Sequence, residues 1–329
     1  MSKVVLVGVP GMNDQEVEAI ERFIKEEAPG VEYEFLGKPV LSDDELVEKA
    51  ADADIIVTWN QQMSDELYSR LKLKAFCCAS TGFDAADTPS ATRHGVMVTN
   101  AKDYCVDEVS AHSVMLILTM ARKLWHVTEN AREDRWSVDG IGNVKRLSDS
   151  TVGIFAFGSI GRGVAEKLKG FGVRMISYDP YVNSEIMTSY GVEKVSFEEL
   201  LTESDYVTLH APLTEETGGM FSKEALSMMK QSAYIINTAR GRIIDQEALY
   251  EALIEGRLAG AGLDVLWNEP PLEIDKKLFG LRNVIITPHS AYFSDEAQEQ
   301  QLRITARDVG RILRGERPVN LRNQIDNYN

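Results

Sequence analysis

The sequence predicts an α/β fold with parallel sheets, divided between two Rossmann-like domains. Short apolar runs alternate with helical patterns along most of the chain, and such alternation is typical of parallel sheets covered by helices. A glycine-bearing turn joins one of these strands to a helix in the middle of the chain. The length of 329 residues exceeds that of one typical domain, so two domains are expected.

The composition excludes several classes of protein. With 44% hydrophobic and 26% charged residues, the chain is an ordinary globular protein. Its net charge of -16 argues against a nucleic-acid partner. Its apolar runs are too short to span a bilayer, so we expect no membrane partner and a cytoplasmic location. Cys77, Cys78 and Cys105 lack metal-ligand spacing and predict buried thiols in a reducing compartment, without a metal.

The first hundred residues predict a parallel sheet with helices on both faces, and ligands collect at the carboxyl ends of such strands. Two loops lie at expected strand ends, at 60–62 and 80–84. The second loop allows two interpretations, a simple turn around Gly82 or a backbone cradle for a small carboxylate. Strands are expected at 3–10, 33–36, 54–59, 75–79 and 96–99, and helices at 13–25, 43–49 and 64–71.

A long helix at 107–124 is apolar over most of its faces. Such a helix belongs in an interior or an interface, so it either joins two domains or packs against a partner subunit. We expect His112, within it, to be a packing residue rather than a catalytic one. The polar segment 126–149 is expected to be a connection.

The segment 151–180 predicts a strand, a glycine-bearing turn, a helix and a second strand. Gly158 and Gly161 fall where the backbone approaches a ligand and where the helix packs close to the strand. The helix, expected at 162–170, would present N–H groups to an anion. An ordinary strand-to-helix turn is the alternative, because a glycine-rich turn alone is a weak signal.

The end of the second strand favours a dinucleotide site. Asp179 follows the strand expected at 173–178 and lies 18 residues beyond Gly161, near the spacing of a carboxylate that binds the adenosine ribose. Its negative charge would repel a 2′-phosphate and favours NAD over NADP. Ala156 stands at the first glycine position of the usual motif, and we expect its φ angle to be negative, where a methyl group is tolerated.

The alternation resumes after this unit, and three strand ends carry notable residues. Pro212 follows one strand, Arg240 a second and His289 a third, so the latter two are expected in the cofactor cleft. Glu269 lies on a loop from the same sheet edge. Strands are expected at 206–210, 233–237, 259–263 and 284–287, and helices at 197–201, 223–229, 246–255 and 297–315.

These residues suit the reduction of a small keto acid. Arginine binds a carboxylate with two parallel hydrogen bonds, which fits Arg240. A carbonyl that receives hydride also needs a proton, and histidine is the residue type suited to supply it, which fits His289. Glu269 would stabilise the protonated ring. The alternatives are a surface ion pair for Arg240, solvent exposure for Glu269 and a strand cap for His289.

Three segments resemble the signature series of the D-isomer-specific 2-hydroxyacid dehydrogenases. They are INTARGRIIDQEAL, AGLDVLWNEPP and NVIITPHSA, in that order. The resemblance implies that Arg240 binds substrate, His289 is the acid/base and Glu269 is its partner. It implies a substrate domain at 1–101 and 292–329 around an inserted NAD-binding domain at 102–291, and a homodimer formed through the NAD-binding domains.

The same resemblance assigns the remaining site residues. Thr81 and Gly82 would bind the substrate carboxylate together with Arg240 and His289. Residues expected to bind NAD are Gly158, Ser159, Ile160, Gly161, Asp179, Pro212, Thr238, Ala239, Arg240 and Asp264.

Segments AKDYCVDEVSAHSVMLILTMARKLW and HSAYFSDEA most resemble the branch that contains the C-terminal-binding proteins and their bacterial relatives. Ser110-Ala111-His112 replaces the commoner A-E-H, and Cys78 stands where many relatives have arginine, which bears on substrate preference. The loop 58–62 has no cation for a substrate phosphate. Three residues fit either an apolar wall of the substrate site or the core. They are Trp59, Met63 and Tyr292.

The sequence therefore predicts an NADH-dependent reductase that converts a 2-keto acid reversibly to a D-2-hydroxy acid, with the proton supplied by His289. One alternative is an NAD(H)-sensing interaction protein of the C-terminal-binding-protein type. Another is a phosphoglycerate dehydrogenase, which the lack of a cation in the loop 58–62 disfavours.

Overall fold

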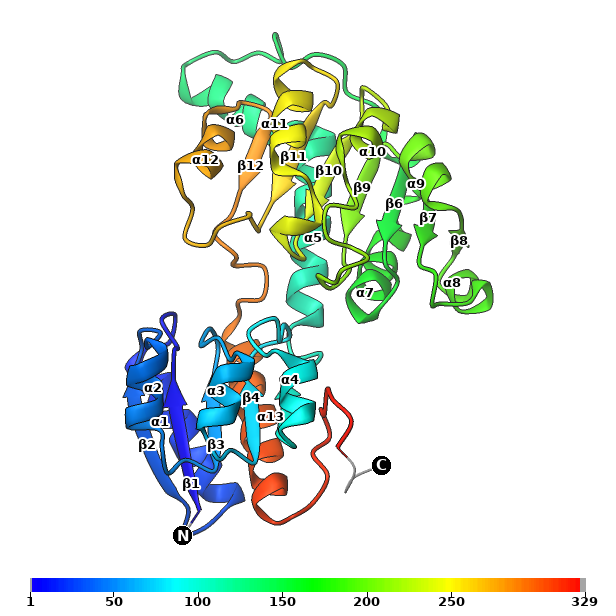
Figure 1. Ribbon diagram of the computed structural model, residues 1–329. Coiled ribbons are helices and arrows are strands. Elements are labelled where there is room, and N and C mark those ends of the chain that lie inside the picture. Colours follow the sequence, from blue (N-terminus) through cyan, green and yellow to red (C-terminus); the bar gives the residue numbers. More distant parts are fainter. Residues whose placement is uncertain (1, 326–329) are drawn as a thin grey trace. The chain divides into compact units, whose positions relative to one another are not determined.

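The computed structural model describes residues 2–325, which form two compact units (Figure 1). Unit 1 ends at Cys105 and resumes at Ser294, and unit 2 is the inserted segment Val106–Phe293. Parallel sheets in both units confirm the predicted fold class. The assignment of substrate and cofactor to the two units, with boundaries at 101/102 and 291/292, stays a prediction.

Within the described residues, unit 1 has a five-stranded parallel sheet in the order β2-β1-β3-β4-β5. Alternate residues of each strand face opposite sides, so Val4 and Leu6 pack with α1 and α13 while Val5 and Val7 pack with α2 and α3. The strands are β1 (Lys3–Val7), β2 (Glu32–Gly37), β3 (Ile55–Thr58), β4 (Ala75–Cys78) and β5 (Met97–Asn100). The helices are α1 (Asp14–Glu27), α2 (Asp43–Lys49), α3 (Asp65–Arg70), α4 (Thr88–Arg93) and α13 (Asp295–Leu313).

Several sequence predictions for unit 1 have a visible structural basis. Asn13 caps α1 through a reciprocal capping box with Glu16. Cys77, Cys78 and Cys105 are buried free thiols, as expected. Met63 belongs to the core, with 2% of its surface exposed, which favours the packing interpretation of this residue.

Unit 2 contains, within the described residues, a seven-stranded parallel sheet in the order β12-β11-β10-β9-β6-β7-β8. From β6 the chain winds outward through β7 and then crosses to β9, so the topological switch point lies between β6 and β9, where ligands of such sheets bind. The strands are β6 (Thr151–Phe155), β7 (Arg174–Tyr178), β8 (Val192–Lys194), β9 (Tyr206–Leu209), β10 (Tyr234–Asn237), β11 (Gly260–Leu263) and β12 (Val284–Ile286).

Helices cover both faces of this sheet (Figure 1). One face packs against α5, α7 and α8, and the other against α9, α10 and α11. The helices are α5 (Val106–Arg122), α6 (Leu124–Arg132), α7 (Ser159–Leu168), α8 (Ser184–Ser189), α9 (Phe197–Glu203), α10 (Lys223–Met228), α11 (Gln246–Ile254) and α12 (Glu273–Lys276). Short 3-10 turns lie at Leu147–Asp149, Lys169–Phe171, Gly241–Ile243 and Lys277–Gly280.

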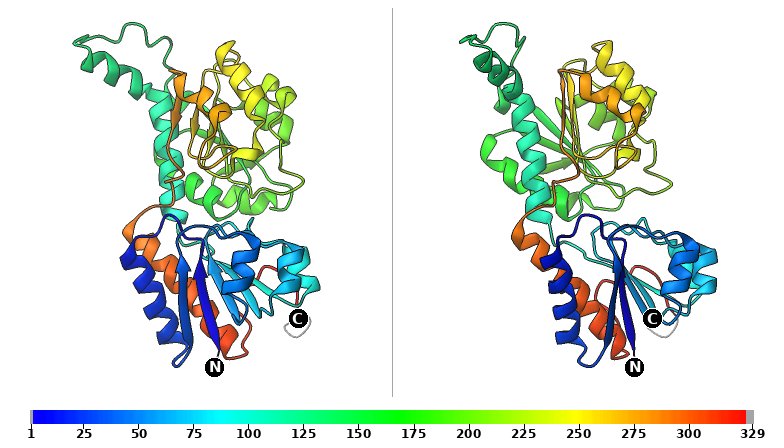
Figure 2. Two further views of the ribbon diagram at one scale, coloured as in Figure 1. Left: turned by 60° about the vertical axis from the view of Figure 1, so that its left-hand side comes forward. Right: turned by 90° about the vertical axis from the view of Figure 1, so that its left-hand side faces the viewer.

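The expected connection at 126–149 is wrong in its first part. Lys123 adopts a left-handed conformation with φ 49, which ends α5, and the chain then forms the separate helix α6. We call residues 124–146 the arm, because they project from the body of unit 2 (Figure 2). Trp136 on the arm has 95% of its surface exposed. Among the described residues, no helix is long and apolar enough to cross a membrane.

A buried carboxylate anchors the arm to the sheet. Asp205, with 8% of its side chain exposed, lies just before β9 and binds Lys145 Nζ at 2.8 Å and the N–H of Thr151 at 2.8 Å. Lys230 Nζ lies 3.5 Å away. Burial raises the pKa of Asp205, but the bonds from Lys145 and Thr151 and the charge of Lys230 outweigh burial, so the pKa is lowered overall.

We expect Asp205→Asn to lower the free energy of unfolding by about 2 kcal/mol at neutral pH, because a buried side chain then loses its charge-assisted hydrogen bond to Lys145 and its attraction to Lys230. A lowered folded-state pKa gives stability that is present above the ordinary Asp pKa of about 3.9 and is lost as pH falls through the folded value. The difference in the free energy of unfolding between the wild type and the variant should therefore become smaller in acid. Urea unfolding at several pH values measures it, with the exposed Glu66→Gln as control. A difference independent of pH would contradict the assignment.

Candidate active site

The glycine-bearing turn offers a site for a phosphate group at the switch point. Gly158 is the N-cap of α7 and has no side chain, and a Cβ placed there would meet no described atom within 4 Å. At Gly161, by contrast, a Cβ would lie 2.4 Å from the carbonyl oxygen of Ala156, so only glycine lets α7 pack against the turn. No side-chain cap binds the first N–H groups of α7, and Gly158 and Ser159 are exposed, which fits the pyrophosphate of a dinucleotide.

Ala156 corrects one expectation from the sequence. Its φ is 71, in the left-handed region, rather than negative. The turn requires this conformation, because the N–H of Ala156 bonds to the carbonyl of Tyr178 while its own carbonyl meets α7 at Gly161. Alanine therefore occupies a conformation that glycine adopts more easily.

Asp179 lies at the end of β7, as predicted, and is largely buried. One carboxylate oxygen accepts the N–H of Phe157 at 2.8 Å, and the other accepts the N–H groups of Tyr181 and Val182. Asp179 thus ties the strand end to the glycine-bearing turn. A carboxylate has about four acceptor positions, so one is left for a ribose hydroxyl. Its contact with ribose stays a prediction.

The turn after β10 carries three predicted residues and depends on one that the sequence did not single out. Asn237 accepts the N–H of Ala239 at 3.0 Å and donates to the carbonyl of Arg240 at 2.9 Å. Thr238 is 8% exposed, and its hydroxyl lies 2.8 Å from that of Ser113 on α5. Asn237 therefore clamps the turn on which Arg240 stands.

Gly241 brings the Arg240 turn against the loop after β11. A Cβ at Gly241 would lie 2.0 Å from the carbonyl oxygen of Leu266, so the two backbones are in direct contact. The loop after β11 carries Glu269, whose Oε1 accepts the N–H of Leu266 at 3.1 Å. Arg240 and Glu269 therefore stand on touching backbone segments.

Glu269 and His289 form the pair that the sequence predicted. Glu269 Oε2 lies 2.5 Å from His289 Nδ1. A carboxylate only accepts hydrogen bonds, so Nδ1 carries a proton. The second ring nitrogen, Nε2, is not part of this bond. The two side chains are 37% and 42% exposed, which leaves them accessible to a substrate. The rings of Tyr292 and His289 also lie edge to face, with centroids 6.3 Å apart.

Asp264 holds the turn on which His289 stands. Its side chain is buried and accepts the Thr287 hydroxyl at 2.5 Å, the Ser290 N–H at 2.9 Å and the Ala291 N–H at 3.0 Å. Its carbonyl oxygen accepts the N–H of His289 at 2.8 Å. The structure thus gives Asp264 a structural role, while its predicted contact with NAD stays a prediction.

His210 also lies at this sheet edge, after β9, but it is unsuited to proton transfer. Burial lowers the pKa of His210 to about 3, so its ring is neutral at physiological pH. Its Nε2 lies 3.0 Å from the Thr208 hydroxyl. Pro212 follows it, and the Pro212 carbonyl accepts the Thr217 hydroxyl at 2.6 Å.

Thr81 and Gly82 belong to unit 1, in the turn after β4. The carbonyl of Thr81 accepts the Asn100 amide at 2.5 Å, and that of Gly82 accepts the Ser80 hydroxyl at 2.7 Å. The Thr81 hydroxyl donates to the carbonyl of Ala101 at 3.3 Å. These bonds give the turn a defined shape, and its binding of a substrate carboxylate stays a prediction.

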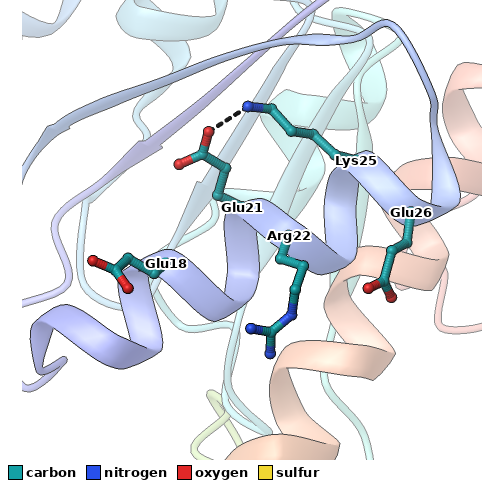
Figure 3. A pocket seen from close by; sticks show the side chains of 5 residues that line it. All are labelled: Glu18, Glu21, Arg22, Lys25 and Glu26. Atoms are coloured by element: carbon teal, nitrogen blue, oxygen red, sulfur yellow. Dashed lines mark hydrogen bonds and ion pairs between the residues drawn. The ribbon is translucent and has the colours of Figure 1, made fainter.

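A hollow on the outer face of α1 is unrelated to this chemistry (Figure 3). All of its lining side chains come from one helix, and Lys25 forms an ion pair with Glu21, one turn away on the same helix. The lining residues are Glu18, Glu21, Arg22, Lys25 and Glu26. Charges at helical spacing on an exposed face describe a solvated surface.

Comparison with known proteins identifies the class. Residues 114–291 match the family model of the NAD binding domain of D-isomer specific 2-hydroxyacid dehydrogenases, and they lie within unit 2. The chain therefore belongs to the D-isomer-specific 2-hydroxyacid dehydrogenase family, and it is an NAD-dependent oxidoreductase. The predicted family, enzyme class and NAD cofactor are confirmed.

Particular relatives span nearly the whole chain. A glyoxylate reductase of Korarchaeum cryptofilum is 37% identical over 284 residues, which are 85% of this chain and 85% of that protein. A D-3-phosphoglycerate dehydrogenase of Methanocaldococcus jannaschii is 38% identical over 286 residues. Those residues are 86% of this chain but 54% of that protein, so the chain spans about half of its length.

A solved structure gives the same picture of the fold. The D-lactate dehydrogenase of Aquifex aeolicus, complexed with NAD and lactic acid, superposes with a TM-score of 0.85 at 30% identity. The match covers 95% of this chain and 96% of that one. The similarity to the branch of the C-terminal-binding proteins stays a prediction.

We expect Ala156→Gly to raise the free energy of unfolding by roughly 0.5 kcal/mol. Left-handed backbone costs alanine about 1–2 kcal/mol, and the added freedom of glycine in the unfolded chain offsets about 0.5–1 kcal/mol of the gain. The control is Ala111→Gly, at an exposed helical position, which should lose about 1 kcal/mol. Thermal unfolding distinguishes them, and a loss of stability in Ala156→Gly would show that the turn does not hold this conformation.

Proposed function

We propose that the protein reduces a small, unphosphorylated 2-keto acid to a D-2-hydroxy acid, and catalyses the reverse oxidation. The observation that carries the proposal is the Glu269–His289 pair, 2.5 Å apart, on the sheet edge that also carries Arg240. Bound NADH supplies the hydride. The groups that would hold NADH are the N–H groups of 158–161, the carboxylates of Asp179 and Asp264, and the turns at Pro212 and at Thr238–Ala239.

His289 supplies the proton. Its Nδ1–H donates to Glu269, so the other ring nitrogen, when protonated, donates to the keto oxygen as hydride reaches the carbonyl carbon. Glu269 stabilises the imidazolium before transfer and keeps the ring oriented, and the N–H of Leu266 in turn fixes the Glu269 carboxylate. In the oxidation, the same nitrogen takes the hydroxyl proton.

Arg240 binds and polarises the substrate. Its guanidinium is planar and stays charged, so it suits the substrate carboxylate and strengthens the partial positive charge on the neighbouring carbonyl carbon. Asn237 and Gly241 fix the backbone on both sides of it. Together, Arg240 and His289 define where the carboxylate and the keto oxygen lie.

The absence of a cation in the sequence 58–62 supports an unphosphorylated substrate. Relatives named glyoxylate reductase and D-lactate dehydrogenase act on acids of this kind according to their names. We therefore favour glyoxylate, pyruvate or a larger 2-keto acid over phosphohydroxypyruvate, the keto form of phosphoglycerate.

We expect NADH oxidation with at least one of glyoxylate, hydroxypyruvate, pyruvate, 2-ketoisocaproate and phenylpyruvate. His289→Ala should lower kcat by about 10³-fold, because general acid catalysis contributes about 10²–10⁴-fold. NADH affinity, measured by fluorescence, should change little. The surface variant His94→Ala is the matched control and should retain full activity. Turnover of 3-phosphohydroxypyruvate alone, or wild-type activity in His289→Ala, would contradict the proposal.

We also propose a homodimer formed through the arm. The arm exposes several apolar side chains, and exposed apolar surface of this kind often marks a site of protein–protein contact. Trp136 is 95% exposed, Val138 68% and Leu124 52%. A second copy of the chain would present the same residues in a two-fold symmetric contact, as closed dimers do.

Light scattering after size exclusion should show a dimer at micromolar concentration. The double variant Trp136→Asp and Val138→Asp should raise the dimer dissociation constant by at least about 30-fold, because buried aromatic side chains dominate interfaces. Phe279→Ser removes an apolar side chain of unit 2 that is 52% exposed and lies outside the arm, and it should leave the dimer intact. A monomeric wild type, or a dimer that survives the double variant, would refute the contact.

A further inference from the structure

His112 is connected to the turn that carries His289. It lies on α5 with 15% of its side chain exposed, and its Nε2 is 3.0 Å from the hydroxyl of Thr287, just after β12. The Thr287 hydroxyl is in turn 2.5 Å from Asp264 Oδ1. His112 Nε2 itself is 3.8 Å from the same carboxylate oxygen, beyond direct hydrogen bonding. The contact of His112 with Asp264 therefore runs through Thr287.

The chemistry of the three side chains determines which group donates and which accepts in each of these hydrogen bonds. An ionised carboxylate only accepts, so the single hydroxyl hydrogen of Thr287 is donated to Asp264. The Thr287 oxygen must then accept from His112, which requires the proton on Nε2 of the His112 ring. Two charge-polarised bonds in series reinforce one another in a buried setting.

The series of hydrogen bonds that starts at His112 ends at a strained segment of backbone. Asp264 accepts the N–H groups of Ser290 and Ala291, immediately after His289. His289 itself has a φ of 50, in the left-handed region that residues other than glycine avoid. Such a conformation persists only where surrounding contacts determine it. The hydrogen bonds around Asp264 are those contacts.

We propose that His112, acting through Thr287, is a positioning residue that keeps Asp264 and the His289 turn in their active arrangement. This inference rests on the proposed function for the role of His289. It also changes the sequence expectation for His112. The ring packs within unit 2 as expected, but its Nε2–H determines how the Thr287 hydroxyl is oriented.

Paired substitutions test the role of the hydrogen bond. His112→Leu removes the donor and should lower kcat about 10-fold, in the range seen for residues that orient a reacting group through another side chain. The KM for NADH should stay within about twofold of wild type, because Asp264 is only one of the several groups proposed to hold NADH and the others lie outside the hydrogen bonds that start at His112. His112→Gln keeps an N–H donor at similar reach and should recover kcat to within about threefold of wild type.

Two substitutions of Thr287 test the same hydrogen bonds independently. Thr287→Val is isosteric but lacks the hydroxyl and should match His112→Leu, whereas Thr287→Ser should resemble wild type. The double variant His112→Leu with Thr287→Val should have the same kcat as Thr287→Val alone. The two substitutions break the same series of hydrogen bonds, so their effects should not add. Ser110→Ala is the control on α5, since the Ser110 hydroxyl donates to carbonyls of its own helix.

Imidazole NMR of the resting protein gives a readout that needs no substrate. The chain has five histidines, so each ring can be assigned by substitution. We expect a proton on Nε2 of His112 and a downfield Nδ1–H signal of His289, which His112→Leu broadens and His112→Gln restores. If the wild type reduces no keto acid while these signals behave as stated, the proposed function fails and the positioning role stands.

Three results would overturn the positioning role. The first is a His112 ring protonated on Nδ1 alone. The second is an unchanged His289 signal in His112→Leu, together with wild-type kcat where activity is measurable. The third is an equal loss in His112→Leu and His112→Gln with a lowered melting temperature in both, which would assign His112 to packing.

Discussion

The buried carboxylate of Asp264 is the constraint on which the rest of the site depends. It lies at the end of β11, and its bonds reach Thr287 after β12 and the two residues after His289. A buried carboxylate that accepts several hydrogen bonds is stable only when all of its donors are in place. The carboxyl ends of β11 and β12 and the His289 turn are therefore held together, and these contacts fix the position of His289, the proposed general acid.

Close backbone approach places the other groups. At Gly241 and Gly161, a methyl group would collide with a carbonyl oxygen, so the Arg240 turn meets the Glu269 loop and α7 meets the glycine-bearing turn. Side-chain clamps on the backbone complete the arrangement, with Asn237 at the Arg240 turn and Asp179 at the glycine-bearing turn. The parallel sheet supplies the common edge, and these local contacts set the distances along it.

Much of this was predictable from the sequence, for identifiable reasons. Strand and helix alternation predicted both sheets, and Arg240, Glu269 and His289 stand at strand ends within long motifs. Other features were not predictable. A left-handed Ala156 or Lys123 leaves no periodic signal, so the φ of Ala156 and the helix α6 were missed. Asn237 acts through two hydrogen bonds to its own turn, and His112 acts through one hydrogen bond to a residue distant in sequence; composition and spacing encode neither.

Isotopic labelling of the cofactor tests whether the site transfers hydride to C2 of the keto acid. The protein would turn over a keto acid that it accepts with NADH deuterated at the transferable position of the nicotinamide, and the product would be analysed by mass spectrometry and chiral chromatography. We expect a D-2-hydroxy acid that carries the deuterium on C2. An L-product, or a product whose C2 hydrogen came from solvent, would contradict hydride transfer at a site organised around Arg240 and His289.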